Sequence, residues 1–110
     1  MGQFIKLPKS KTDLTSFDLM NVSGGVCEII SNSSTTLQVR VGVAFINAGN
    51  EELPLYEITI SSAMNDLQRL QMIQNMSEVV QKSTQAPNSV LSLELLGDLV
   101  VSSLTYRAVL

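Results

Sequence analysis

Histidine and tryptophan are absent from this chain, and cysteine occurs once. Without an imidazole, serine–histidine and cysteine–histidine nucleophile pairs and histidine metal sites are excluded. Cys27 has no second cysteine for an internal disulfide, and its apolar neighbours predict a buried free thiol. The adjacent carboxylates of Glu51 and Glu52 fall in a predicted hairpin loop, where we interpret them as solvated surface charges. We therefore expect a protein that is not an enzyme, with no small-molecule substrate, metal or cofactor.

Charge is also scarce, because charged residues make up 15% of the chain, against the usual quarter. Seven basic and ten acidic residues give a net charge of −3. This balance disfavours nucleic-acid binding, which normally needs a basic patch for phosphates. No run of about 18 apolar residues is present, so no membrane span is expected. The opening residues lack the apolar centre of a secretory signal, so none is expected there.

Apolar and polar residues alternate in several short segments, which is typical of half-buried strands. The longest alternation covers 35–46, and clusters of serine, threonine, asparagine and glycine at 31–34 and 47–50 predict turns on either side of it. We therefore expect residues 26–46 to form a hairpin. The expected strands are 4–7, 17–22, 26–30, 35–46 and 55–60.

A different period follows, in which apolar residues recur every three or four positions over 61–84. It predicts one amphipathic helix, capped by Ser61 or Ser62 and ending before Pro87. The predicted helix stripe is Met64, Leu67, Leu70, Ile73, Met76 and Val80. We expect this stripe to pack on the inward side chains of the long strand, which are Leu37, Val39, Val41, Val43 and Phe45.

Two interpretations fit the last part of the chain. Residues 90–96 and 99–109 form a closing hairpin around Gly97 and Asp98, or 89–96 form a short helix. The β-rich composition after residue 99 favours the hairpin. The expected fold class is α+β: a mostly antiparallel sheet of about five to six strands, covered by one helix and ending in a β-hairpin. We expect residues 1–110 to form a single domain.

Charge patterning suggests one pair of contact segments. We expect residues 1–16 to form a flexible or arm-like segment that carries three lysines, while three glutamates cluster around the 47–54 loop. A head-to-tail pairing of lysines with glutamates would produce a homo-oligomer, and the alternative is a monomer with a mobile lysine arm. The candidate protein–protein contact residues are Lys6, Lys9, Lys11, Glu51, Glu52 and Glu57.

Five phrases give the chain a family likeness. They are Phe4-Ile5-Lys6-Leu7-Pro8, the Asn21-Val22 step, the serine- and threonine-rich turn with its strand at 31–41, the helix entry at 58–62, and the closing phrase at 101–106. In this order the chain resembles a group of small proteins from tailed phages of marine bacteria. None of the residues that carry the resemblance is catalytic in that pattern.

The resemblance implies a non-enzymatic virion component, such as a capsid decoration or cement protein, produced in the host cytoplasm and located in the virion. Its partners would be other capsid or virion proteins and copies of itself. The chain departs from the pattern in a leucine-rich segment at 89–99 and a longer polar linker at 9–16. A weaker resemblance to small flagellar-regulator-type domains leaves a regulatory binding module, flagellar-regulator-like or antitoxin-like, as the alternative.

Overall fold

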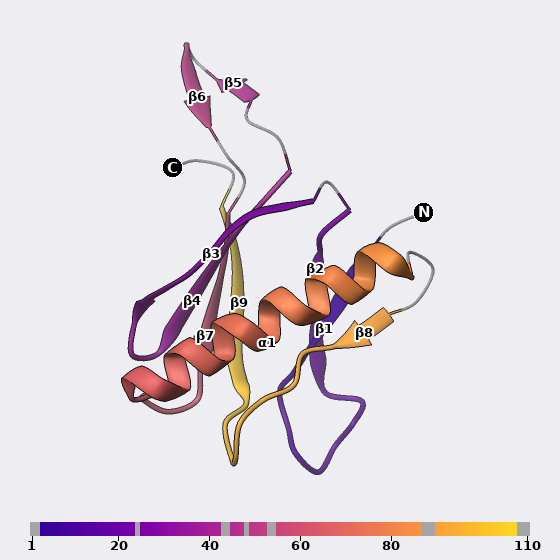
Figure 1. Ribbon diagram of the computed structural model, residues 1–110, viewed down its shortest axis with the longest axis vertical. Helices are drawn as coiled ribbons and strands as arrows, with labels where there is room; N and C mark the ends of the chain where they lie inside the picture. Colours follow the sequence, from indigo (N-terminus) through magenta and orange to yellow (C-terminus); the bar gives the residue numbers. More distant parts are fainter. Residues whose placement is uncertain are drawn as a thin grey trace.

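The computed structural model describes residues 3–23, 25–42, 45–47, 49–52, 55–86 and 90–107. Within these residues there are two mostly antiparallel sheets, a short two-stranded ribbon and one long helix. The helix lies diagonally across both sheets (Figure 1). The predicted α+β class, with one helix and mostly antiparallel pairing, is confirmed. The prediction of one sheet with about five to six strands is wrong, because the strands of the described residues divide between two sheets and the separate ribbon.

Sheet A has the strand order β2-β1-β8, with β1 at Phe4–Pro8, β2 at Phe17–Asn21 and β8 at Val90–Ser92. β1 pairs antiparallel with β2 and parallel with β8. Alternate side chains of β1, those of Ile5 and Leu7, are completely buried. The prediction of a flexible or arm-like segment over 1–16 is therefore wrong for residues 4–8, which form the centre of this sheet.

Sheet B has the order β3-β4-β7-β9, and all its pairs are antiparallel. Its strands are β3 (Val26–Ser33), β4 (Thr36–Val41), β7 (Leu55–Ile60) and β9 (Val101–Arg107). The apolar face is the one on which Leu37 of β4 lies beside Ile58 of β7. The opposite face carries polar neighbours such as Gln38 and Glu57, so the period-two alternation predicted these faces correctly.

Two boundaries around β4 differ from the prediction. β3 continues through Ser33, so the turn lies at 34–35 and not at 31–34. The long strand 35–46 is broken, since β4 ends at Val41 and Gly42 has a φ of 75°. This left-handed conformation suits glycine and turns the chain out of the sheet. Leu37, Val39 and Val41 are buried as predicted, whereas Val43 and the side chain of Phe45 lie outside the described residues.

Beyond this break the chain forms a separate ribbon. β5 (Phe45–Asn47) pairs antiparallel with β6 (Asn50–Glu52). Gly49, between the two strands, has a φ of 83°. The predicted 47–50 turn therefore joins these two short strands, which form a sheet of their own and do not extend β4 or β7.

The helix α1 spans Asp66–Gln85 and begins four residues after Ser62, the later of the two serines predicted to cap it. Its N-cap is Asn65, whose side-chain oxygen accepts a hydrogen bond from the Gln68 amide at 2.8 Å. The Gln68 side chain accepts from the Asn65 amide at 3.0 Å, which completes a capping box. Ser61 instead accepts a hydrogen bond from the Val100 amide at 3.1 Å. The predicted serine cap is therefore wrong.

The buried face of α1 is also rotated from the prediction. Met72, Met76 and Val79 point into the core, while Leu67 is 74% exposed and Leu70 is 52% exposed. The first turns of α1 lie along β3, at the margin of sheet B, so side chains there have less of the sheet to cover (Figure 1). The prediction that Leu67 and Leu70 belong to the core is wrong, and that for Met64 and Met76 is confirmed.

The last two strands do not form a hairpin. β8 joins sheet A beside β1, and β9 joins sheet B beside β7, so residues 93–100 connect the two sheets. Gly97 does lie in a turn, closed by a hydrogen bond from the Leu99 amide to the Leu96 carbonyl at 3.0 Å. The chain leaves that turn in a new direction. The predicted closing hairpin is wrong, and so is the alternative helix, over residues 90–96.

Cys27 occupies an irregular position in β3. The pairing of β3 with β4 shifts between Val26 and Glu28, so Cys27 is the extra residue of a bulge. Its side chain is exposed, with Sγ 3.5 Å from the Arg40 carbonyl. The prediction of a buried thiol is wrong because the bulge turns this side chain away from the core.

Candidate interaction surfaces

The outer face of sheet A is the first candidate surface. Residues paired directly across a sheet share a face, and Lys6 is paired with Leu19 on one side and Ser92 on the other. These residues alternate with buried ones along their strands, so they lie on the face directed away from the core. Leu19 and Val90 are each 48% exposed. The outer face of sheet A comprises Phe4, Lys6, Pro8, Phe17, Leu19, Asn21, Val90 and Ser92.

Lys6 is the charged residue in the middle of this face. Its Nζ lies 4.8 Å from the centre of the Phe17 ring, an arrangement that a cation–π attraction stabilises. No ion pair to Lys6 is found in the part of the chain that the structure describes. Its ammonium is therefore available to a carboxylate that approaches the outer face.

The loop 9–16 borders the same face and forms a hollow of about 210 Å³ beside it. Its ends are joined by a hydrogen bond from the Lys9 amide to the Ser16 carbonyl at 2.9 Å. Leu14, near the end of this loop, is 84% exposed and contributes to the wall of the hollow. The outer face and this loop thus place uncovered apolar side chains around Lys6.

Asp13 fixes the shape of the loop. Its Oδ1 accepts hydrogen bonds from the Thr15 hydroxyl at 2.6 Å and from the Thr15 amide at 3.0 Å. These two bonds lower the pKa of Asp13 from its ordinary value of 3.8. Asp13 therefore stays ionised at neutral pH and adds one negative charge to the margin of the hollow.

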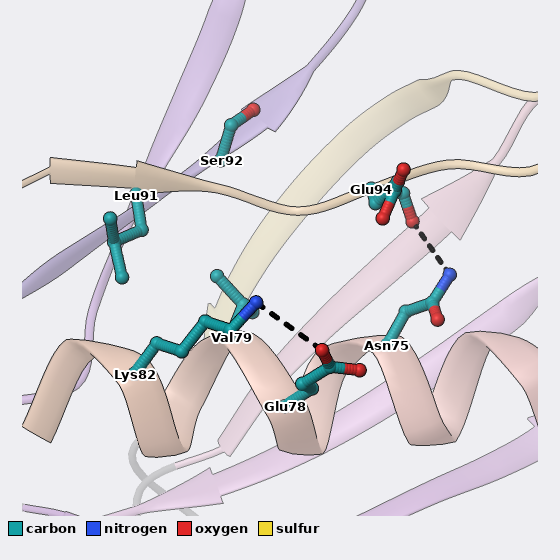
Figure 2. Close-up of a pocket in the computed structure, with 7 residues that line it drawn as sticks. All are labelled: Asn75, Glu78, Val79, Lys82, Leu91, Ser92 and Glu94. Carbon is teal, nitrogen blue, oxygen red and sulfur yellow. Dashed lines mark hydrogen bonds and ion pairs between the residues drawn. The ribbon is translucent and has the colours of Figure 1, made fainter.

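The groove between α1 and β8 is the second candidate surface (Figure 2). It measures about 190 Å³, with Val79 of the helix and Leu91 of β8 as its apolar part. Figure 2 shows Leu91 directed toward the helix and Ser92 directed to the opposite side of β8. At one end of the groove, the side-chain amide of Asn75 donates a hydrogen bond to the Glu94 backbone carbonyl at 3.1 Å.

Charges of both signs line the helix wall of this groove. Lys82 Nζ lies 3.2 Å from a Glu78 carboxylate oxygen, and both side chains are about two-thirds exposed. The Glu94 carboxylate has no ion pair or hydrogen bond within the described part of the chain. After pairing within the chain, the groove therefore has one surplus negative charge.

The six residues predicted to make contacts do not share one surface. Lys9 lies 3.8 Å from an Asp18 carboxylate oxygen, and Lys11 donates to the Leu95 carbonyl at 3.3 Å. Glu57 lies on sheet B, where its carboxylate accepts a hydrogen bond from Gln38 at 3.1 Å. Glu51 and Glu52 are in β6, and their side chains lie outside the described residues. The head-to-tail pairing of lysines and glutamates stays a prediction.

The outer face of sheet A was not predicted as a contact surface from the sequence, although a signal was present. In Phe4–Pro8 apolar residues occupy both sets of alternate positions, interrupted by Lys6. A strand that is apolar on both faces is typical of one covered on both faces. In the structure, the face of β1 that carries Ile5 is buried, whereas the face that carries Phe4 is only partly covered. This difference indicates that the outer face lacks a binding partner.

Comparisons with protein-family models, with curated proteins and with solved structures found no match. Within the described residues, no group of three or more metal-ligating side chains comes together. No helix in that part of the chain combines the length and the apolar character that a membrane crossing needs.

Proposed function

We propose that this protein is a non-enzymatic structural component of a tailed-phage particle, such as a capsid decoration or cement protein. It acts through protein–protein contacts that the outer face of sheet A makes with another virion protein. The observation that carries the proposal is the group of uncovered apolar side chains, those of Leu14, Leu19 and Val90, on and beside that face. The resemblance of the Phe4–Pro8 phrase to proteins of this group supports the same role, because that phrase forms the centre of sheet A.

Burial of apolar side chains drives the proposed contact. Neighbouring exposed apolar groups mark sites of protein contact more often than isolated ones do. Leu19 is flanked by Lys6 on the same face, and covering a half-exposed leucine gains about 1 kcal/mol. Several such contacts, repeated over many copies, hold a small protein on a shell. The complementary surface is apolar and supplies a carboxylate for Lys6.

The first experiment asks whether the protein is in the particle. Particles purified from the host that carries the gene are analysed by quantitative mass spectrometry. We expect the protein at a copy number comparable to that of shell proteins. Absence from the particle, together with binding of the purified protein to a promoter fragment at physiological salt, would instead support the regulatory binding module.

The second experiment asks whether the outer face makes the contact. Leu19→Thr and Val90→Thr remove apolar surface but keep side chains that suit a strand. Leu70→Gln is the matched control, because Leu70 is 52% exposed but lies on α1. We expect the two strand variants to keep the wild-type circular dichroism and to bind particles lacking the protein at least about tenfold more weakly, as a loss of about 1.4 kcal/mol implies. Equal binding by all three variants would exclude this face.

A further inference from the structure

We infer that the groove between α1 and β8 binds an extended segment of a partner protein, which adds to sheet A as a fourth strand along the free edge of β8. This inference does not rest on the particle role proposed above. It follows from the backbone of β8, from the dimensions of the groove and from the charge that remains unpaired there.

The backbone of β8 has an unused edge. In a parallel ladder, residues that bond the neighbouring strand alternate with residues whose N–H and C=O point the other way. The Leu93 amide donates to the Lys6 carbonyl at 2.9 Å, and Lys6 is paired with Ser92. Leu91 and Leu93 therefore direct their backbone toward β1, while Ser92 directs its N–H and C=O away from it. No hydrogen bond from these Ser92 groups is found within the described residues.

The helix provides the second wall. Extended peptides commonly bind where an exposed strand edge lies beside a groove that accepts alternate side chains. Here the apolar part formed by Val79 and Leu91 lies next to the free edge (Figure 2). At about 190 Å³ the groove is smaller than the roughly 300 Å³ at which typical small-molecule sites begin. It suits one apolar side chain of a bound strand better than a whole metabolite.

Charge defines the bound segment further. Glu78 and Lys82 pair with each other, and the Glu94 carboxylate remains without a partner in the described residues. The Glu94 backbone carbonyl is already occupied by Asn75, which ends the free edge at that point. We therefore assign the groove to an extended segment with an apolar side chain for Val79 and Leu91, followed by a basic side chain for Glu94.

The test uses a library of short random peptides selected on the wild-type protein. Ser92→Pro removes the outward N–H, and proline is tolerated at an edge position whose N–H bonds no neighbour. Ser92→Thr is the matched control, because threonine keeps the N–H and suits a strand. We expect selection to enrich peptides with an apolar and a basic residue. These peptides should bind Ser92→Thr like wild type and Ser92→Pro at least about tenfold more weakly.

Two further measurements make the outcome decisive. In the wild type, binding of the selected peptide should shift the Ser92 amide resonance and slow the hydrogen exchange of that amide. The amide resonance of Leu19, which lies on the outer face, should not shift. Glu94→Gln should weaken the binding of a selected peptide about two- to fivefold, as expected for the loss of an exposed ion pair. The inference is overturned if no peptide is enriched over Ser92→Pro, or if enriched peptides leave the Ser92 amide unchanged. If Ser92→Pro does not fold, the Ser92 amide exchange and Glu94→Gln decide the question.

Discussion

The orientation of α1 can be tested by truncating two of its apolar side chains to alanine. Met76 is completely buried, whereas Leu67 is 74% exposed, although both belong to the stripe that the sequence predicts as core. Met76→Ala removes three heavy atoms, each worth about 0.8 kcal/mol when buried. The cavity left behind raises the expected loss in the free energy of unfolding to about 3 kcal/mol. Leu67→Ala should change it by less than about 0.5 kcal/mol.

The assay is urea unfolding followed by circular dichroism, supported by thermal unfolding. For a domain of this size, a loss of about 3 kcal/mol lowers Tm by roughly 12–24 °C. Leu67→Ala also serves as the control for helix propensity, since alanine is the best helix former. Equal destabilisation by the two substitutions would refute the rotation of α1, because it would require Leu67 to be buried as deeply as Met76.

Three smaller effects follow from the helix cap, the helix core face and the loop 9–16. Asn65→Ala should lower the free energy of unfolding by about 1 kcal/mol, measured by urea unfolding against Ser62→Ala as a control that should change little. Ser83 is completely buried and its hydroxyl has no hydrogen-bond partner in the described residues, so Ser83→Ala should raise the unfolding free energy by about 1 kcal/mol; a loss would reveal a hidden partner. The lowered pKa of Asp13 means that its stabilising contribution is present above pH 3.8 and disappears as the pH falls through the lowered pKa. Thr15→Val should raise that pKa toward 3.8, as an NMR titration of the Asp13 carboxyl would show, and an unchanged pKa would exclude the Thr15 hydroxyl as a cause.

Periodicity located most strands and the helix because local burial produces it. Alternation from Leu37 to Val41 and from Leu55 to Ile60 identified two adjacent strands of sheet B and their apolar faces. It could not show where the long strand breaks, because the pattern continues past Gly42 without interruption. The break depends on a single backbone conformation, which glycine permits but does not require.

The start and rotation of α1 were harder to read for a related reason. Ser61, Ser62 and Asn65 are all acceptable N-caps, and sequence alone does not rank them. Gln68, three residues after Asn65, completes a capping box and was the signal that distinguishes Asn65. The buried face depends on where the helix lies relative to sheets that are remote in sequence, so no local pattern determines it.

The two proposed binding surfaces meet at β8, where one residue contributes to both through different atoms. Ser92 lines the hollow on the outer face of sheet A and also the groove beside α1. A side chain and the backbone groups of a strand leave it in perpendicular directions, so the surfaces can be separated at this residue. Glu94→Gln, which changes the groove alone, should weaken binding of the extended segment about two- to fivefold and leave particle binding unchanged, while Leu19→Thr should weaken particle binding and leave binding of the segment unchanged. If both substitutions weakened both activities, one partner would cover β8 from its edge and its outer face together.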